Sequence, residues 1–209
     1  MKSKEIIELA WQLYSEKVAS QLLHPRNEKM MQLQLAQILQ TLAPLYETQS
    51  NESIKVLLEH PAQIKNGTAI IDIVIEHHLG ERLEFTTIEL KCFRRYSNNS
   101  TTKQRGAQNL GMYDYWADIE NCEQYCHLEH FHSAYQLTLT DDPYYVTTLH
   151  KGKQVIVYST NIDRKNVSGI LMQQIANRKG YLELEGNYEL PWQKKGDFYF
   201  IQQKINSTH

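Results

Sequence analysis

The sequence predicts an α/β domain in which a mixed central β-sheet is flanked by helices. Two stretches near the N-terminus, 4–24 and about 27–42, place apolar residues at the 3.6-residue period of an amphipathic helix. The segments 69–77 and 82–93 instead alternate between apolar and polar residues, as half-buried strands do. Helical and strand patterns that follow one another in this way are typical of a layered α/β domain.

Length and composition favour one globular domain spanning residues 1–209. The chain is 41% hydrophobic and 22% charged, and its formal net charge is −2. It has no apolar run of the roughly 18 residues that a membrane span needs, and its start lacks a signal-peptide pattern. The three cysteines have no disulfide-framework spacing, so we expect a cytoplasmic location without membrane contact. Any nucleic-acid binding must use a local basic patch.

The remaining elements are predicted from breakers and periodicity. Pro25 ends the first helix, Asn27 is a plausible N-cap for the second, and Pro44 ends that helix. A strand is expected at 54–58, followed by a connection at 61–67. A helix is expected at about 103–125, then strands at 136–140 and 155–158, a helix at 168–178 closed by Gly180, and a closing hairpin of 181–190 with 198–205.

The turn between the two alternating strands sets their register. Gly80 occupies the first central position, where a two-residue type II′ hairpin requires glycine. With Gly80-Glu81 as the loop, the register places Asp72 directly opposite Glu89. Side chains in such a pair have Cβ atoms roughly 4.5–5.5 Å apart. Lys91 lies two residues beyond Glu89 and therefore shares its face.

Two carboxylates at this distance indicate a cation site. They repel one another unless a cation neutralises them, and Mg²⁺ often takes one or two carboxylates together with substrate phosphates. The alternative is structural: Asp72 forms a salt bridge with Lys91 or Arg82, and Glu89 is a surface residue.

The pattern of Asp72, sixteen intervening residues and then Glu89-Leu90-Lys91 resembles the core motif of the PD-(D/E)XK nucleases, the restriction-endonuclease-like superfamily. Ile71 stands where the family name has proline. The resemblance covers Asn27 to about Tyr158 and implies a core of a helix, three strands, a helix and a strand. The N-terminal helix, and the C-terminal helix plus hairpin, are then additions to a core of about 27–158.

The resemblance also implies further site residues. Glu28 matches an acidic residue that many members place near the start of the helix before the first strand, where it contributes to the metal site. Gln104 and Gln108 both match a glutamine on the helix after the E-x-K strand, and we assign Gln104 to the catalytic set. Tyr113 follows Gln108 by five residues, not the four of the Q-x-x-x-Y subgroup. The alternatives are a carboxylate favoured by the helix dipole for Glu28 and surface positions for the glutamines.

Four basic residues flank the polar loop beyond the site strand. Arg94, Arg95, Lys103 and Arg105 form a cluster suited to binding a phosphate backbone. A solvated loop is the alternative. As a whole, the resemblance implies a Mg²⁺-dependent endonuclease acting on DNA, with Mn²⁺ as a substitute and a restriction-type or mobile-element defence role.

Two other functions stay open. One is a nuclease-like nucleic-acid-binding module without turnover, and the other is a zinc-stabilised interaction protein. The second rests on a cluster of cysteines and histidines whose spacing matches no common zinc finger, namely Cys122, Cys126, His127, His130 and His132. The expected partner is double-stranded DNA, and the sequence leaves a homodimer open.

Overall fold

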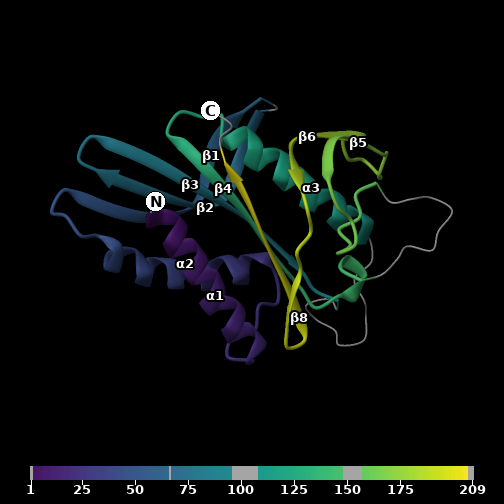
Figure 1. Cartoon of the computed structure of the whole chain (residues 1–209), viewed down its shortest axis with the longest axis horizontal. Coiled ribbons are helices and arrows are strands. Elements are labelled where there is room, and N and C mark those ends of the chain that lie inside the picture. The colour runs from purple at the N-terminus through teal and green to yellow at the C-terminus, as the bar shows by residue number, and fades with distance from the viewer. Residues whose placement is uncertain (1, 66, 96–107, 148–156, 207–209) are drawn as a thin grey trace.

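The computed structural model describes residues 2–65, 67–95, 108–147 and 157–206. Within them the chain is an α/β protein whose mixed six-stranded sheet has helices on both faces (Figure 1). The elements are α1 (Lys2–Ala19), α2 (Glu28–Tyr46), β1 (Glu52–Ile64), β2 (Gly67–Leu79), β3 (Arg82–Phe93), α3 (Gln108–Tyr125), β4 (Phe131–Thr140), a 3₁₀ turn (Pro143–Tyr145), β5 (Val167–Met172), β6 (Tyr181–Tyr188), β7 (Gln193–Lys195) and β8 (Phe198–Asn206).

The described strands of the main sheet follow the order β1-β2-β3-β4-β8-β7. Neighbouring strands are antiparallel except β3 and β4, which are parallel and joined through α3. A parallel pair needs such a crossover connection. The predicted α/β class with a mixed, helix-flanked sheet is therefore confirmed, as is the order of a helix, three strands, a helix and a strand from α2 to β4.

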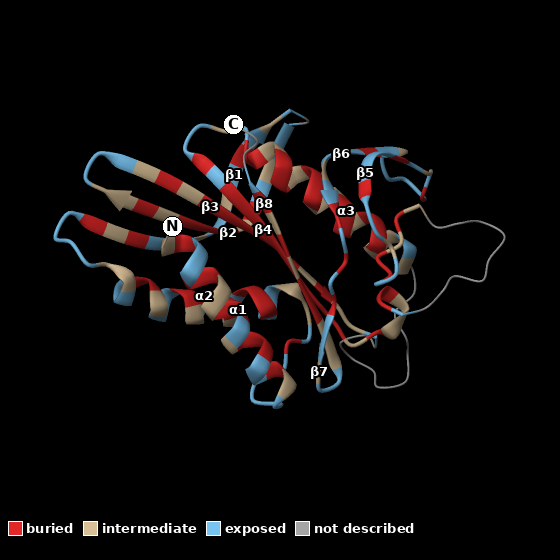
Figure 2. Ribbon diagram, in the orientation of Figure 1, coloured by how far each residue is buried: buried red, intermediate tan, exposed pale blue. Residues whose placement is uncertain are grey.

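The sheet separates two hydrophobic cores, and its buried residues run along the middle of the strands (Figure 2). Helices α1 and α2 cover one face, where Ile88, Leu90 and Cys92 of β3 are buried. Helix α3 and the separate β5–β6 pair cover the other face. Because strand residues alternate between faces, Glu89 and Lys91 share a face, as the sequence predicts, and the structure places that face on the α3 side.

The β2–β3 hairpin has the predicted register, from Leu79 opposite Arg82 to Ile73 opposite Ile88. Gly80 has a φ of +59°, whereas Glu81 does not have a positive φ. A type II′ turn requires a positive φ at its first central residue only. The local chemistry of one glycine therefore fixes which residues of the hairpin lie opposite one another.

The predicted helix at 168–178 is wrong, because this segment holds strand β5 paired with β6. Val167, Leu171 and Ile175 are buried at a spacing of four, which imitates the stripe of a helix. Gly169 adopts a φ of +69°, which lies outside helical geometry. The C-terminal addition to the core therefore contains β-structure where a helix was expected.

The predicted closing hairpin is also wrong in its pairing. Strand β6 pairs with β5, while β8 joins the main sheet between β4 and the short β7. Val157 and Tyr158 lie in a turn where a strand was predicted, and residues 155–156 lie outside the described residues. Strand β1 continues through Pro61, which an edge strand tolerates.

Helix boundaries differ from the prediction more modestly. Helix α1 ends at Ala19, while α2 continues past Pro44 to Tyr46. Asn27 is the predicted N-cap, since its side chain accepts a hydrogen bond from the Met30 amide at 2.8 Å. None of the described helices has the length and hydropathy to cross a membrane.

Gly80→Ala should lower the free energy of unfolding by about 1–2 kcal/mol, because a side chain disfavours the left-handed backbone at φ +59°. The measurement is urea unfolding followed by circular dichroism. Glu81→Ala is the matched control, since Glu81 is the exposed second residue of the same turn. A Gly80→Ala protein that unfolds at the wild-type midpoint would contradict the type II′ turn.

Candidate functional site

The site lies where β2 and β3 stop pairing. Their backbone ladder ends at Ile73 and Ile88, one position before Asp72 and Glu89, while β3 stays paired with β4 as far as Phe93. Asp72 bridges the gap, because its Oδ2 accepts a hydrogen bond from the Leu90 amide at 2.9 Å. A side chain thus satisfies a backbone donor that β2 no longer reaches, and this contact fixes the Asp72 carboxylate against β3.

The backbone of Asp72 is held from the opposite side by α2. Gln32 Nε2 donates to the Asp72 carbonyl at 2.7 Å and to Glu59 Oε1 at 2.6 Å. Lys29 of the same helix pairs with Glu59 at 2.5 Å. Glu59 has a left-handed φ of +53° in β1. The first turns of α2 therefore fix the distorted part of the sheet that carries Asp72.

Glu89 is buried, with 6% of its surface exposed, and it faces α3. Its Oε1 accepts a hydrogen bond from the Tyr125 hydroxyl at 2.7 Å. The carboxyl groups of Glu89 and Asp72 lie close enough together for the charge of Asp72 to raise the pKa of Glu89. Two neighbouring carboxylates repel one another, so protonation of one of them, or a cation beside them, is favoured.

Lys91 is surrounded by oxygen atoms. Its Nζ lies 2.7 Å from Asp118 Oδ2 of α3 and 3.5 Å from Glu28 Oε2 at the start of α2. It also donates to the Leu90 carbonyl at 3.2 Å. The structure therefore brings together Asp72, Glu89, Lys91 and Glu28 from the sequence-predicted set.

The structural alternative drawn from the sequence does not describe this arrangement. Lys91 pairs with Asp118 and Glu28, and Arg82 pairs with Glu84, so neither cation takes Asp72 as its ion-pair partner. Glu89 is buried and not a surface residue. Glu28 fits both of its interpretations, because it is the first residue of α2 and also contacts the site lysine.

Burial dominates the electrostatics of the site. It raises the pKa of Asp72, although the Leu90 amide and Lys91 lower it. Burial also raises the pKa of Glu89 well above its ordinary value, and the negative charges of Asp118 and Asp72 add to the rise. Carboxyl groups in this environment favour protons or another cation over the free ionised state. Perturbed carboxyl groups gathered at one point are characteristic of functional sites.

The same forces act on the ion pair of Lys91 with Asp118. Burial raises the pKa of Asp118 to about 7, although Lys91 lowers it. Burial lowers the pKa of Lys91, but the carboxylates of Asp118 and Glu28 outweigh this effect and hold the pKa above its ordinary value. Lys91 therefore keeps its positive charge at neutral pH.

The oxygen donors fit a hard cation that completes its coordination with other ligands. In the described part of the chain, no group of three or more His, Cys, Asp or Glu side chains is arranged to hold a metal ion. Asp72 and Glu89 nevertheless lie close enough to influence one another's pKa, and Mg²⁺ is commonly bound by one or two carboxylates plus water and substrate phosphates. The donor set thus suits a site shared with substrate and not a cage made wholly of protein.

The predicted basic cluster is only partly described. Lys103, Arg105 and Gln104 lie outside the described residues. Arg94 forms an ion pair with Asp141 at 2.9 Å, and its guanidinium lies over the Phe198 ring. Arg95 is exposed, and its backbone amide donates to Asp141. The charge of Arg94 is therefore already paired in this structure.

The cysteines and histidines of 122–132 do not converge within the described residues. Cys122 Sγ contacts the Tyr135 carbonyl, and Cys126 Sγ contacts the Ile205 carbonyl. His127 pairs with Glu185 at 2.9 Å. These side chains have separate partners, so the geometry gives the zinc hypothesis no support.

Sequence reasoning missed Asp118 and Tyr125 on α3. Asp118 lies between Tyr115 and Cys122 on the buried face of the helix, and Tyr125 follows seven residues later on that face. An acidic residue within an apolar helical stripe was the available signal, because a buried charge requires a partner.

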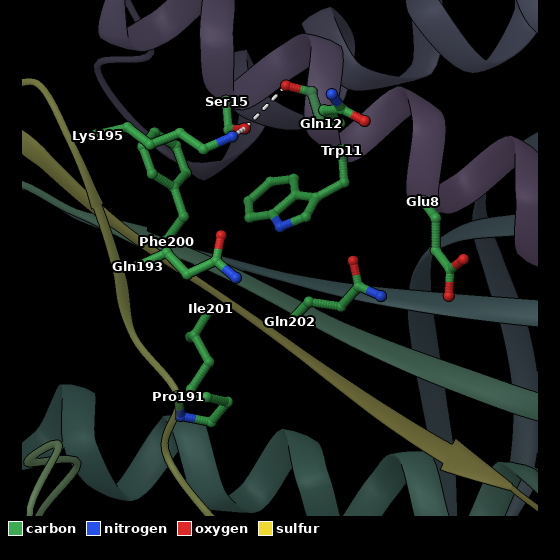
Figure 3. A pocket seen from close by; sticks show the side chains of 10 residues that line it. All are labelled: Glu8, Trp11, Gln12, Ser15, Pro191, Gln193, Lys195, Phe200, Ile201 and Gln202. Atoms are coloured by element: carbon green, nitrogen blue, oxygen red, sulfur yellow. Dashed lines mark hydrogen bonds between the residues drawn. The ribbon is translucent and has the colours of Figure 1, made fainter.

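A separate cavity of about 460 Å³ lies between α1 and strands β7 and β8 (Figure 3). Trp11 and Phe200 line it together with amide side chains, and Lys195 Nζ donates to Ser15 Oγ at 2.7 Å at one end. Among the sequence-predicted site residues that the structure describes, none lines this cavity. The carboxylate site is thus distinct from this cavity.

Protonation of the site should stabilise the metal-free fold, because carboxyl pKa values are higher in the folded than in the unfolded chain. Their contribution is complete below an ordinary carboxyl pKa of about 4 and is lost as pH rises through the folded values, which for Asp118 is about 7. Glu89→Gln should therefore flatten the fall of melting temperature between pH 5 and 8, measured in EDTA.

Glu5→Gln is the control for that measurement, since Glu5 is an exposed carboxylate of α1, the helix on the opposite face of the sheet. Its melting temperatures should follow the wild-type dependence on pH. A Glu89→Gln curve parallel to that of the wild type would show that the Glu89 carboxyl is not perturbed.

Comparisons with known proteins give no match. No family model matches the chain, and neither a curated protein nor a solved structure does. What this site can do therefore follows from its residues and their geometry.

Proposed function

We propose that this chain is a Mg²⁺-dependent nuclease with a restriction-endonuclease-like core, and that it hydrolyses phosphodiester bonds of double-stranded DNA. One observation carries the proposal: the carboxyl groups of Asp72 and Glu89 lie close enough to influence one another and Lys91, at the point where the pairing of two central strands ends. The order of elements from α2 to β4 supports it, because the PD-(D/E)XK resemblance implies a helix, three strands, a helix and a strand. A restriction-type or mobile-element defence role, with Mn²⁺ as a substitute metal, belongs to the same proposal.

Asp72 and Glu89 would hold the metal, with Glu28 as the adjacent carboxylate at the α2 N-terminus. When bound, Mg²⁺ supplies Lewis-acid activation of the scissile phosphate and lowers the pKa of a water ligand. The Leu90 amide orients the Asp72 carboxylate, and the Tyr125 hydroxyl orients Glu89. These contacts hold both carboxylates in place before substrate arrives, which reduces the reorganisation required in the transition state.

Lys91 would stabilise negative charge that develops on the phosphate. Its ammonium retains its proton because the nearby carboxylates raise its pKa, and it lies on the same strand face as Glu89. The ammonium is largely shielded from water, where an electrostatic contact is stronger than at the surface.

A specific observation favours the second candidate, a nucleic-acid-binding module without turnover. The Lys91 ammonium already contacts the carboxylates of Asp118 and Glu28 and the Leu90 carbonyl. A nuclease must let Lys91 exchange one of these partners for substrate. The two candidates therefore differ in turnover and not in the expected location of bound nucleic acid.

Asp72→Asn and Glu89→Gln should each reduce Mg²⁺-dependent plasmid cleavage by about a hundredfold or more, because each removes a charged ligand of a shared metal. The measurement compares nicked and linear products with Mg²⁺, with Mn²⁺ and with EDTA. Glu76→Gln, a carboxylate of the same β2 strand, should cleave at the wild-type rate. Wild-type protein that cleaves neither DNA nor RNA in any of these metals would leave the binding module as the better account.

Lys91→Met should reduce kcat strongly while DNA affinity changes by less than about twofold, because a group that acts mainly in the transition state affects rate more than binding. Affinity is measured in Ca²⁺ so that hydrolysis does not interfere. Lys55→Met, on the exposed side of β1, is the control and should change neither quantity. If weaker binding accounts for the whole loss, Lys91 is a phosphate anchor instead.

A further inference from the structure

Two side chains of α3 reach the two functional residues of β3. Asp118 Oδ2 lies 2.7 Å from Lys91 Nζ, and the Tyr125 hydroxyl lies 2.7 Å from Glu89 Oε1. The later helix residue contacts the earlier strand residue, so α3 runs antiparallel to β3. Both contacts are shielded from solvent, since the side chains of Lys91 and Asp118 are only 14% and 13% exposed and both Tyr125 and Glu89 are buried.

The distance between Asp118 and Tyr125 along α3 is close enough to the distance between Glu89 and Lys91 along β3 for their side chains to meet. Residues seven apart on one helix face are separated by about 10.5 Å, whereas residues two apart on a strand are separated by about 6.7 Å. The long side chains of Tyr125 and Lys91 span the remaining difference. One helix face can therefore hold both residues of the E-x-K pair at once.

Helix α3 is itself fixed by the core. Trp116 is fully buried, and its Nε1 donates to the Tyr158 carbonyl at 3.1 Å. Met112 and Ile119 are buried against the sheet in the same cluster. Sliding or rotating α3 would break these contacts, so the positions of Asp118 and Tyr125 relative to β3 are set by packing.

We infer that α3 carries the positioning residues of the site, with Asp118 directing the Lys91 ammonium and Tyr125 directing the Glu89 carboxylate. This inference rests on the proposed function and adds residues that the D…E-x-K motif does not contain. Neither Asp118 nor Tyr125 needs to touch substrate. Each acts through the residue that it holds, so its loss should reduce kcat while KM for DNA stays unchanged.

The test uses two substitutions that keep shape and two matched controls on the same helix. Asp118→Asn and Tyr125→Phe should each lower kcat by about ten- to a hundredfold, the range found when a supporting partner of a site residue is removed. Asp114→Asn replaces a carboxylate that pairs with Arg178 at 2.9 Å on the outer side of α3, and Tyr113→Phe removes a hydroxyl one turn before Trp116. Both controls should retain wild-type kcat and KM. Asp118→Glu keeps the carboxylate and should retain more activity than Asp118→Asn.

A second readout does not depend on cleavage. Acetylation of Lys91 by a water-soluble acetylating reagent, followed by mass spectrometry of peptides, reports how firmly the ammonium is held. Lys91 should react several-fold faster in Asp118→Asn than in the wild type or in Asp114→Asn, all at a temperature where circular dichroism shows each protein folded.

The outcomes separate this inference from the proposed function. If the wild type cleaves DNA and both α3 variants retain its kcat, the inference is overturned while the nuclease proposal stands. If kcat and KM both change, and the change follows the decrease in melting temperature of each variant, α3 has a structural role only. The inference is then again overturned. If the wild type does not cleave, the nuclease proposal fails, and an unchanged acetylation rate in Asp118→Asn then overturns the positioning of Lys91 as well.

Discussion

The antiparallel pairing of β2 with β3 decides where each strand residue of the candidate site lies. The Gly80 turn fixes the register, and alternation along β3 then directs Ile88, Leu90 and Cys92 into the core below α1 and α2. Glu89 and Lys91 are consequently directed to the α3 side. A shift of one residue would move Glu89 and Lys91 to the face that packs against α1 and α2, which makes such a register strongly unfavourable.

The site also brings several carboxyl groups close together, and their mutual repulsion is unfavourable. Four carboxyl groups, from Glu28, Asp72, Glu89 and Asp118, lie close enough to influence one another around Lys91. Burial raises the pKa of each of them, so the metal-free fold is stabilised when protons are bound. A cation offers an alternative to those protons, and the same electrostatic cost that reduces stability at neutral pH would then favour metal binding.

Helix α3 contributes neighbouring residues to both the hydrophobic core and the candidate site. Trp116 and Ile119 pack against the sheet, while Asp118 and Tyr125 hold Lys91 and Glu89. The supporting contacts of a functional site are more precise when they come from a packed helix than from a loop. The start of α2 acts in the same way from the other side, because Gln32 fixes the Asp72 carbonyl and Glu28 contacts Lys91.

The sequence by itself determined the features that depend on neighbouring residues. The Asn27 N-cap, the Gly80 turn, the strand register and the shared face of Glu89 and Lys91 all follow from short-range geometry, and the structure agrees with each. Only the tertiary structure decided the rest. Strand β5 was predicted as a helix because apolar residues four positions apart can share a buried face in either a helix or a strand. Pairing with β6 selected the strand. Asp118 and Tyr125 joined the site because packing brought α3 over β3, and no local pattern states which distant residue will satisfy a buried charge.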